Sequence, residues 1–475
     1  MKALRSKVAV MGCIAVTGFA VTFVSAQNAT INLSDEKQLV RGFGGMVHIP
    51  WIGDLNSSER TLAFGNGQGQ LGLTVLRIAV PDGNTSTSSY VTTAKAAIAA
   101  GGLVFASPWN SGGNMSSSQF ASYADHLNSF ATYMKGQGAE LYAISVQNEP
   151  DYGDWRHWSA ADIRDFIINY GDQISTRLMT GESFQYRKNY YNDLLNDEKA
   201  LANWDILGAH TYGTQLRDYP YPLFDEKGIP AGKERWMTEV YTNSNTDANQ
   251  WPDALGVATD VHNSMVEGQF NVYTWWYIKR SYGFINNGAI TKRGYCMAQY
   301  AKFVRPGYKR IDATKSPTGN VLVSAYKSVK NDSLIIVAVN NNNSSSTVKF
   351  KIEGGTATSL SKYTTSSSKS CASDGEATVT DGSFSGSLDS KSVSTWAGKV
   401  SGTGIIRINT GHHTVPVTVS AKELSGYTVY TLSGRKLNKA QISMIGVNGS
   451  GYSSGLFLLR NTISGQSRLI NGITR

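Results

Sequence analysis

The sequence has few of the residues that build metal clusters and disulfide frameworks. It contains 3 cysteines in 475 residues, and no group of cysteines and histidines has the spacing of a zinc site. No glycine-rich phosphate-binding loop follows a predicted strand. We therefore expect neither a metal ion nor another cofactor. Cys296 and Cys371 could form one disulfide bond, which a chain of this length does not need in order to fold.

Long apolar runs are also missing after the first residues of the chain. Residues 1–26 carry three basic residues before an apolar run and end in Val24-Ser-Ala26, where small residues suit a signal peptidase. The run is short and contains glycines, and no further apolar span supports a membrane protein. We predict a signal peptide over residues 1–26 and a secreted protein without a membrane span.

Acidic residues are scarce at the two ends of the chain only. The net charge of +9 would suit a nucleic-acid-binding protein. Residues 1–26 contribute three basic residues and no acidic one, while residues 401–475 contribute eight basic residues against Glu423 alone. Residues 27–400 therefore carry a net charge of −1. This near-neutral body argues against a nucleic-acid-binding surface.

The clearest chemical signal is an apolar run that ends in a carboxylate. Residues 141–146 have the composition of a buried strand in a parallel sheet, and Gln147-Asn148-Glu149-Pro150 follow. In a barrel of parallel strands, catalytic groups lie where the strands end. The alternative role of Asn148 and Glu149 is to cap a following helix, and Pro150 favours an extended residue before it.

A second apolar run, Arg235–Tyr241, delivers another carboxylate, Glu239. Two carboxylates on separate strands are the minimum for cleaving a glycosidic bond, because one protonates the leaving oxygen while the other attacks carbon or activates water. The pair of Glu149 and Glu239 therefore predicts a glycoside hydrolase. The sequence leaves open whether they lie about 5–5.5 Å apart, as in retaining enzymes, or about 6.5–9.5 Å apart, as in inverting ones.

Residues 45–308 alternate short apolar runs with helical patterns, which is the order of a parallel sheet with crossover helices. Eight strands are predicted, at Gly45–Ile49, Leu73–Val80, Gly102–Trp109, Leu141–Glu149, Arg177–Phe184, Asp205–Tyr212, Arg235–Tyr241 and Asn271–Ile278. Helices are predicted between them, for instance at Ser118–Gly136 and Pro252–Gly268. Eight such strands close a (β/α)8 TIM barrel, which would be the catalytic domain.

Residues 309–400 change to an alternation of period two with turns of Asn, Ser and Gly. The predicted strands are Ser333–Asn340, Thr347–Glu353, Ala377–Asp381 and Ser392–Ala397, with Asn340–Ser346 as a hairpin loop. Such strands form an antiparallel sheet with one solvated face. We predict a β-sandwich side domain, which strands in residues 27–44 join from the front of the chain, and a separate basic β-rich module over residues 401–475.

Polar and aromatic residues gather at the ends of the predicted barrel strands. They are Arg77, Trp109, Asn110, Asn148, Glu149, Glu182, His210, Tyr212, Glu239, Tyr241, Trp275 and Trp276. No metal-ligand partners stand near His210 in sequence, so a hydrogen-bonded barrel histidine is the better interpretation. One of Trp275 and Trp276 belongs to the core, because adjacent strand residues point to opposite sides. We expect Asp151 and Asp154, in the loop after Pro150, to be solvated.

Several motifs together resemble bacterial glucuronoxylanases of glycoside hydrolase family 30, subfamily 8. The resemblance runs from Ala29 to Lys399 and rests on the following segments: Arg41-Gly-Phe-Gly-Gly45, Val146-Gln-Asn-Glu-Pro150, His210-Thr-Tyr-Gly213, Trp236-Met-Thr-Glu239, Trp275-Trp-Tyr-Ile-Lys-Arg-Ser-Tyr282, Phe303-Val-Arg-Pro-Gly-Tyr-Lys-Arg-Ile-Asp-Ala-Thr-Lys315 and Val321-Leu-Val-Ser-Ala-Tyr-Lys327. It implies a (β/α)8 barrel joined to a β-sandwich. It also implies a retaining endo-hydrolase of β-1,4-xylan that carries glucuronic acid or its 4-O-methyl ether.

The resemblance also implies roles for single residues. Glu149 would be the acid/base, Glu239 the nucleophile, and Asn148 a hydrogen-bond donor to the sugar 2-hydroxyl. The other implied substrate-binding residues are Trp109, Tyr212 and Trp276 at the cleavage subsite, Arg280 and Tyr282 at the glucuronate, and Trp51 and Tyr241. Glu182 would support the site without taking part in the chemistry.

Departures from the family pattern bear on specificity. The loops after Val80 and Trp109 are shorter than in typical members, and so is the segment after Glu239. A glucuronate-binding serine of the family aligns with Asp247, whose carboxylate would repel that group if it pointed inward and could instead pair with Arg280. A relative that cleaves neutral xylan or another β-glucan is therefore the alternative within enzymes. A non-catalytic polysaccharide binder is the alternative class, but both carboxylates are present.

The last 75 residues allow three roles. Tyr430-Thr-Leu-Ser-Gly-Arg-Lys436 and Ser454-Gly-Leu-Phe-Leu-Leu-Arg460 are similar to C-terminal sorting or surface-attachment domains of some secreted bacterial enzymes. The basic residues would equally suit adhesion to anionic polymers such as glucuronoxylan or the cell envelope. A plain solvated β-module is the third role. As partner we expect plant cell-wall xylan that bears glucuronic acid, with no nucleic acid, and we expect a monomer.

Overall fold

The computed structural model describes residues 27–401, except residues 87, 111, 242–246 and 331, together with five short strands between residues 419 and 474. Residues up to 404 form one compact unit and residues 405–475 form a second. Among the described residues, no helix is long and apolar enough to cross a membrane. The predicted signal peptide over residues 1–26 lies outside the described residues.

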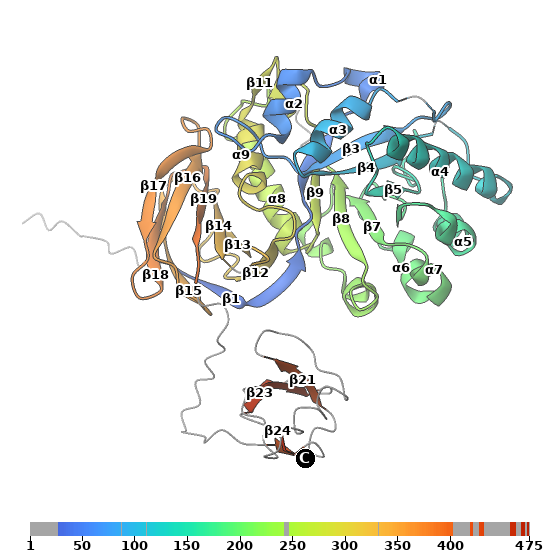
Figure 1. The fold of residues 1–475 in the computed structure, drawn as a ribbon. Coiled ribbons are helices and arrows are strands. Elements are labelled where there is room, and N and C mark those ends of the chain that lie inside the picture. The colour runs from blue at the N-terminus through green and yellow to red at the C-terminus, as the bar shows by residue number, and fades with distance from the viewer. Residues whose placement is uncertain are drawn as a thin grey trace, which may run out of the picture. The chain divides into compact units, whose positions relative to one another are not determined.

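Eight parallel strands close into a barrel in the first unit (Figure 1). They are β2 (Gly42–Met46), β3 (Val75–Val80), β4 (Leu103–Pro108), β5 (Ala143–Ser145), β6 (Arg177–Met179), β7 (Ile206–His210), β8 (Glu234–Glu239) and β9 (Val272–Tyr277). Neighbours along the chain pair with each other, and β9 pairs with β2 to close the ring. The predicted (β/α)8 barrel is thereby confirmed.

Helices surround the barrel on its outer face (Figure 1). The α-helices are α1 (Ile49–Ile52), α2 (Ser57–Phe64), α3 (Val91–Ala99), α4 (Phe120–Gly136), α5 (Ala160–Tyr170), α6 (Asn189–Asn196), α7 (Glu198–Ala202), α8 (Gly256–Val266) and α9 (Lys292–Ala301). The 3-10 helices are η1 (Ser117–Gln119), η2 (Gly171–Gln173), η3 (Leu216–Asp218) and η5 (Asp253–Leu255), and η4 (Phe224–Gly228) is a π-helix. Reciprocal caps begin two of the helices, since Asn56 with Glu59 starts α2 and Ser159 with Asp162 starts α5.

The first barrel strand starts earlier than the sequence pattern predicts. We expected it at Gly45–Ile49, but β2 covers Gly42–Met46, so residues 42–44 lie in the barrel. A Cβ atom on Gly44 would lie 1.8 Å from the backbone oxygen of Val75 on β3. This close approach requires glycine. Because glycine has a low strand propensity, the same residues hid the strand from the sequence analysis.

The inside of the barrel is a filled core below a polar layer. Its floor is a cluster of side chains from seven strands: Val75, Phe105, Ala143, Met179, Ile206, Trp236 and Val272. Side chains two residues further along a strand face the same way. Arg77 on β3 and Thr274 on β9 therefore stand one layer above this floor, both fully buried.

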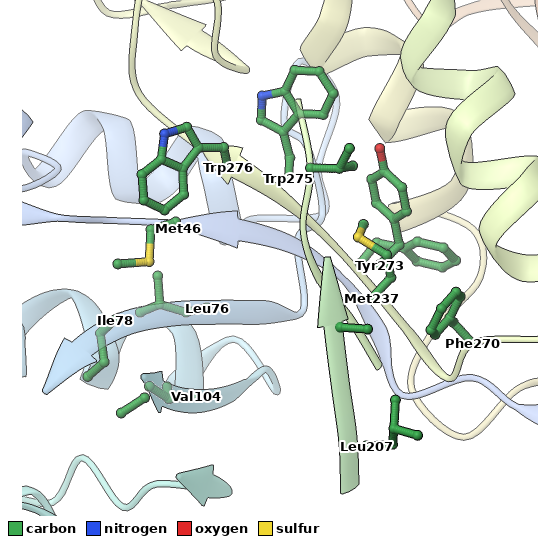
Figure 2. Close-up of a cluster of buried hydrophobic side chains, with 14 of the residues drawn as sticks. Met46, Leu76, Ile78, Val104, Leu207, Met237, Phe270, Tyr273, Trp275 and Trp276 are labelled. Carbon is green, nitrogen blue, oxygen red and sulfur yellow. The ribbon is translucent and has the colours of Figure 1, made fainter. Parts of the chain in front are cut away.

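Side chains on the outer face of the strands pack under the helices. Figure 2 shows part of this cluster, which includes Leu76, Leu207 and Met237. The indoles of Trp275 and Trp276 point away from each other in that view. Trp275 is fully buried against Phe284, with ring centroids 5.6 Å apart, whereas Trp276 faces the barrel mouth and keeps 8% of its surface exposed. The expectation that one of the two belongs to the core is correct.

Nine strands form the side sheet that adjoins the barrel (Figure 1). They are β1 (Gln27–Leu39), β12 (Lys309–Ala313), β13 (Val321–Lys327), β14 (Ser333–Asn340), β15 (Ser346–Glu353), β16 (Ser359–Thr365), β17 (Ala372–Thr378), β18 (Ser383–Leu388) and β19 (Ser392–Lys399). Their order is β17-β16-β19-β14-β13-β12-β1-β15-β18. Side chains from β14, β15, β18 and β19 share one apolar core, which includes Ile336, Phe350, Phe384 and Trp396.

The side sheet corrects two details of the sequence analysis. β14 pairs with β13 and β19, while β15 pairs with β1 and β18, so residues 340–346 connect distant strands and are not a hairpin loop. β17 lies at Ala372–Thr378 and not at Ala377–Asp381, because it is a polar, mostly exposed edge strand without apolar alternation. Hydrogen bonds from Gln299 on α9 to Thr365 and from Thr395 to Gln299 join the sheet to the barrel helices.

The second unit is described only through its backbone pairings. β21 (Tyr427–Thr431), β22 (Phe457–Asn461) and β23 (Ser467–Ile470) form an antiparallel sheet. β20 (Val419–Ser420) pairs in parallel with β24 (Ile473–Thr474). Most residues of the predicted basic module lie outside the described residues, and its candidate attachment role stays a prediction. In the first unit, Cys296 and Cys371 are free thiols, so they do not form the disulfide bond that we considered.

Candidate active site

Two carboxylates meet in the polar layer above the barrel core. Glu149 follows β5, the fourth barrel strand, and Glu239 ends β8, the seventh. One oxygen of each and one ring nitrogen of His210 lie within 4.8 Å of one another, and all three side chains are buried. Retaining glycoside hydrolases hold their carboxyl groups about 5–5.5 Å apart and inverting ones about 6.5–9.5 Å apart. The approach of the nearest oxygens to within 4.8 Å therefore favours the retaining geometry over the inverting one.

A bulge in β8 aims Glu239 into the barrel. Trp236 faces the interior, so strict alternation along the strand would turn Glu239 outward. The pairing of β8 with β7 shifts by one residue after Met237, which leaves Thr238 as an extra residue. Bulges of this kind re-aim a side chain next to an active site.

Both oxygens of Glu239 have hydrogen-bond donors. The Tyr212 hydroxyl donates to Oε1 at 2.8 Å, and Arg77 donates to Oε2 through a guanidinium nitrogen. Burial raises the pKa of Glu239, against the charges of His210 and Arg77, which lower it. The two donors hold the carboxylate in one orientation and stabilise its ionised form.

Glu149 sits on a strained backbone between two donors. Its φ is +43°, the left-handed region, and not the extended conformation that we expected before Pro150. Its backbone nitrogen donates to the backbone oxygen of Glu182 at 2.9 Å, and this hydrogen bond fixes the turn. Its Oε1 lies 2.9 Å from His210 Nδ1, and its Oε2 accepts a hydrogen bond from Trp155 Nε1 at 3.0 Å. Strain of this kind is typical of functional sites.

Arg77, Glu182 and His210 form a buried charge network beneath the pair. Arg77 lies 3.0 Å from Glu182, and His210 Nε2 lies 3.5 Å from the same carboxylate. Burial alone would raise the pKa of Glu182, but the charges of Arg77 and His210 lower it to about 2. Burial would lower the pKa of His210, but the charge of Glu239 and hydrogen bonds to Glu149 and Glu182 raise it to about 9. His210 is therefore an imidazolium at neutral pH.

Asn148 is oriented by the same arginine. Arg77 donates to its Oδ1 at 2.6 Å, which leaves the amide nitrogen facing away from the network. That nitrogen, Nδ2, is buried and has no hydrogen-bond partner among the described residues. A buried donor without a partner is costly unless a ligand satisfies it. Asn148 is thus prepared to donate to a bound hydroxyl group.

The cluster of Glu149, His210 and Glu239 has the composition of a metal site but not its electrostatics. A metal-binding histidine must be neutral, whereas the raised pKa of His210, about 9, keeps the ring protonated. Arg77 already places a positive charge against Glu239 and Glu182. These residues do not fit a metal cation. Their arrangement suits proton transfer and the stabilisation of charge.

Aromatic side chains wall the site on the side of β2, β4 and β9. Trp51 lies 5.9 Å from Trp276 and 6.3 Å from Trp109 between ring centroids, and 45% of its surface is exposed. Trp109 packs 5.9 Å from Trp276 and stands over the Arg77 guanidinium at 4.6 Å. Flat apolar rings of this kind stack on sugar rings. The structure thus brings together three of the predicted substrate-binding residues.

A second aromatic row leads from Glu239 to Arg280. Tyr212 packs edge-on against Tyr241 at 5.5 Å, and Tyr241 stacks on Tyr282 at 5.2 Å. The Arg280 guanidinium stands 5.0 Å from the Tyr282 ring and 4.9 Å from the Tyr277 ring. Within the described residues Arg280 forms no ion pair.

Asp247 does not neutralise Arg280, contrary to the alternative that the sequence left open. Its exposed carboxylate accepts hydrogen bonds from the backbone and side chain of Asn249 at 3.0 and 3.2 Å. It is therefore held by its own loop. The guanidinium of Arg280 keeps its donors for a ligand.

Three residues of this site were not predicted from the sequence. Trp155 and His48 carried no motif signal, yet Trp155 bonds to Glu149, and the His48 ring stacks on Trp51 at 3.9 Å. Asp151, which we expected to be solvated, accepts hydrogen bonds from Ser183 Oγ and the Phe184 nitrogen at 2.9 Å each. The one sequence feature that could have pointed to Trp155 is the high frequency of tryptophan after Pro150. Asp154 is exposed, as expected.

The chain is similar to several known proteins. No family-level sequence profile matches the chain. A glucuronoxylanase XynC of Bacillus subtilis is 48% identical over 396 residues, which cover 79% of this chain and 93% of the relative. A solved family 30 endoxylanase from Clostridium papyrosolvens has a TM-score of 0.72 and 38% identity, covering 78% of this chain and all of that chain.

A family 30, subfamily 8 xylanase from Clostridium acetobutylicum has the same TM-score of 0.72, with 31% identity over 79% of this chain and all of that chain. The matched lengths span nearly the whole of these relatives, so the likeness covers the complete barrel and side sheet. The chain therefore belongs to glycoside hydrolase family 30, subfamily 8, and is a retaining glycoside hydrolase.

Proposed function

We propose that this protein is a secreted endo-acting hydrolase of β-1,4-xylan that is directed by glucuronic acid or 4-O-methylglucuronic acid side groups. The observation that carries the proposal is the buried pair of Glu149 and Glu239, whose nearest oxygens lie within 4.8 Å of each other. Arg280, which forms no ion pair within the described part of the chain, lies over the rings of Tyr277 and Tyr282. The matched relatives are themselves a glucuronoxylanase and xylanases.

In the first chemical step, Glu239 would be the nucleophile. Its carboxylate attacks the anomeric carbon, and the bond to the leaving oxygen breaks as Glu149 gives that oxygen a proton. Arg77 and Tyr212 hold the attacking carboxylate by its two oxygens. The product is a covalent glycosyl ester on Glu239 and a shortened chain with a free hydroxyl.

In the second step, Glu149 would act as the base. It takes a proton from a water molecule, whose oxygen attacks the anomeric carbon and releases Glu239. His210 donates to Glu149 Oε1, so the proton that Glu149 exchanges would travel through Oε2, on the side of Trp155. Asn148 Nδ2 is placed to donate to the sugar 2-hydroxyl, a contact that strengthens in the transition state.

Arg280 would read the glucuronate. A guanidinium presents a planar fork of donors that matches a carboxylate better than an ammonium does. Its position over the rings of Tyr277 and Tyr282 fixes the direction of this fork. The Tyr282 hydroxyl would supply another donor, since burial raises its pKa to about 12.

Activity on two polymers tests this assignment. We expect Arg280→Ala to lose about 2–5 kcal/mol of transition-state binding on glucuronoxylan, as for a buried charged contact. Slow cleavage of undecorated xylan should stay nearly unchanged. Arg280→Lys is the matched control, because it keeps the charge but loses the fork, and it should recover part of the loss. The measurement is kcat/KM on both polymers together with the lengths of the products.

An equal fall of kcat/KM on both polymers, or none on either, would contradict glucuronate reading by Arg280. Cleavage of both polymers without preference would then favour the alternative of a hydrolase of neutral xylan or another β-glucan. Binding to xylan without any cleavage would instead indicate a polysaccharide-binding protein.

Export and the last 75 residues complete the proposal. The composition of residues 1–26 supports a signal peptide, and substrate of plant cell-wall origin would be met outside the cell. The basic residues of the segment 401–475 support a role in sorting, surface attachment or adhesion to anionic polymers. The proposed catalytic groups all come from one chain, so a monomer would suffice for activity.

A further inference from the structure

A basic hollow opens on the loops that follow β6 and β7. Its volume is about 460 Å³. The charged residues of its lining are Arg187, Lys188, Arg217 and Asp218. This lining holds three basic side chains against one carboxylate. The hollow is therefore electropositive although residues 27–400 as a whole are nearly neutral.

Lys188 is a partly buried cation with no carboxylate partner. Its Nζ lies 3.1 Å from the centroid of the Tyr186 ring and donates to the Asp218 backbone oxygen at 2.5 Å. Among the described residues no carboxylate forms an ion pair with it. Burial and the charge of Arg235 lower the pKa of Lys188 to about 7. A bound anion would stabilise this ammonium.

The two arginines of the hollow are only loosely held. Arg187 Nε lies 3.6 Å from Asp151, beyond hydrogen-bond distance, and its Nη2 donates to Gln185 at 3.1 Å. Arg217 Nε lies 3.9 Å from Asp218, and 80% of its side chain is exposed. In both pairs the arginine is exposed and the separation exceeds hydrogen-bond distance, so each pair contributes little. Both guanidinium groups keep donors for a ligand.

Tyr152 and Phe184 connect the hollow to the acid/base side of the active site. The Tyr152 nitrogen donates to the Glu149 backbone oxygen at 3.0 Å, and its ring lies 4.9 Å from Phe184. Phe184 in turn stacks on Tyr212 at 5.1 Å and directly precedes Gln185. This contact path runs from the hollow to Glu149, which would protonate the leaving sugar.

We propose that Arg187, Lys188 and Arg217 form a second uronate-binding subsite, which takes a glucuronate branch on the leaving side of the cleaved bond. This inference rests on the proposed function, since it requires a glucuronate-bearing xylan as substrate. The chemistry is that of a guanidinium fork and an ammonium on one carboxylate. A polymer with closely spaced branches would then engage Arg280 and the basic hollow together.

The test compares two glucuronoxylans that differ in how closely the 4-O-methylglucuronate branches are spaced. We expect Arg187→Ala/Arg217→Ala to lose about tenfold in kcat/KM on the densely branched polymer, the effect of roughly one good contact. On the sparsely branched polymer, where only Arg280 meets a branch, we expect no change. Lys349→Ala/Lys351→Ala on β15 is the matched control, because it removes two positive charges from the side sheet.

A loss of the same size on both polymers, or in the control as well, would overturn the subsite and indicate a general charge effect. No loss on either polymer would also overturn it. Arg217→Glu is an independent variant at an exposed position, and it should reduce kcat/KM on the dense polymer alone and more strongly than alanine. Failure of the Arg280 assignment would be visible on the sparse polymer alone, and the comparison between polymers would still decide the question of the hollow.

Discussion

Arg77 and Glu239 form an ion pair that is buried inside the barrel, one layer above Val75 in the apolar floor. The same guanidinium donates to Asn148 and lies 3.0 Å from Glu182. One side chain on β3 thus sets the orientation of groups from the fourth, fifth and seventh strands. A buried charge that holds three partners is costly to remove, because each partner loses its compensation.

Replacing this arginine should affect both folding and catalysis. We expect Arg77→Met to lower the free energy of unfolding by about 3–5 kcal/mol, since it leaves buried carboxylates uncompensated. Arg77→Lys should recover part of this stability but not the activity, because an ammonium cannot reach all three partners at once. Urea unfolding and kcat/KM on xylan measure the two effects. A methionine variant as stable as the wild type would show that the network does not stabilise the fold.

We expect Trp155 to support proton donation by Glu149. We expect Trp155→Phe to lower kcat/KM on xylan by about tenfold or more, because Glu149 loses the hydrogen bond at Oε2, the oxygen through which it would exchange its proton. An activated aryl xyloside needs no protonation of its leaving group, so its kcat/KM should fall less. Trp51→Phe is the comparison variant: Trp51 stacks on Trp155 at 5.8 Å and belongs to the proposed sugar-binding wall, so its loss should be of similar size on both substrates. An equal loss on both substrates would mean that Trp155 acts only by stacking.

The raised pKa of His210 predicts that the folded protein loses stability in alkaline solution. Its pKa is raised to about 9 in the folded protein from an ordinary value of 6.5. A raised pKa contributes stability that is complete below pH 6.5 and lost as the pH rises through 9. We expect the free energy of unfolding of the wild type to fall by about 3 kcal/mol more than that of His210→Gln across this window. Parallel pH profiles in the two proteins would contradict a protonated His210.

Deleting residues 401–475 should leave turnover on soluble xylan nearly unchanged, because the catalytic residues and both cores lie in the first unit. If the basic residues bind anionic material, the truncated protein should be retained less on insoluble cell walls, and salt should abolish the difference. Turnover and retention at low and high ionic strength are the measurements. A folded truncation with collapsed turnover would show that the segment belongs to the catalytic unit.

The barrel could be predicted from the sequence because its strands are buried on both faces and form continuous apolar runs. That pattern placed Glu149 on the fourth strand and Glu239 on the seventh, as the structure does. The start of β2 was missed, since its glycines are there for a close approach to Val75 and carry no apolar signal. The exposed strand β17 was misplaced for a similar reason.

Side-chain positions in the site depended on features without a sequence signature. Alternation would have turned Glu239 outward, and only the bulge at Thr238 brings it to Glu149. The bond from Trp155 to Glu149 crosses an irregular loop, whose path no periodicity predicts. Asp151 was assigned to solvent because it follows a proline in a loop, yet it fastens the Phe184 segment to that loop.

The roles of Glu149 and Glu239 are tested most directly by detecting the covalent glycosyl-enzyme. Each variant, Glu149→Gln or Glu239→Gln, would be mixed in excess over an activated aryl xyloside. The release of the aryl group and the mass of the intact protein would be followed over one turnover. Glu149→Gln should still show a burst and gain the mass of the glycosyl unit, because attack by Glu239 needs no acid for a good leaving group. Glu239→Gln should show neither. A burst and a mass increase in Glu239→Gln, or an equal loss of both in the two variants, would contradict the assigned roles.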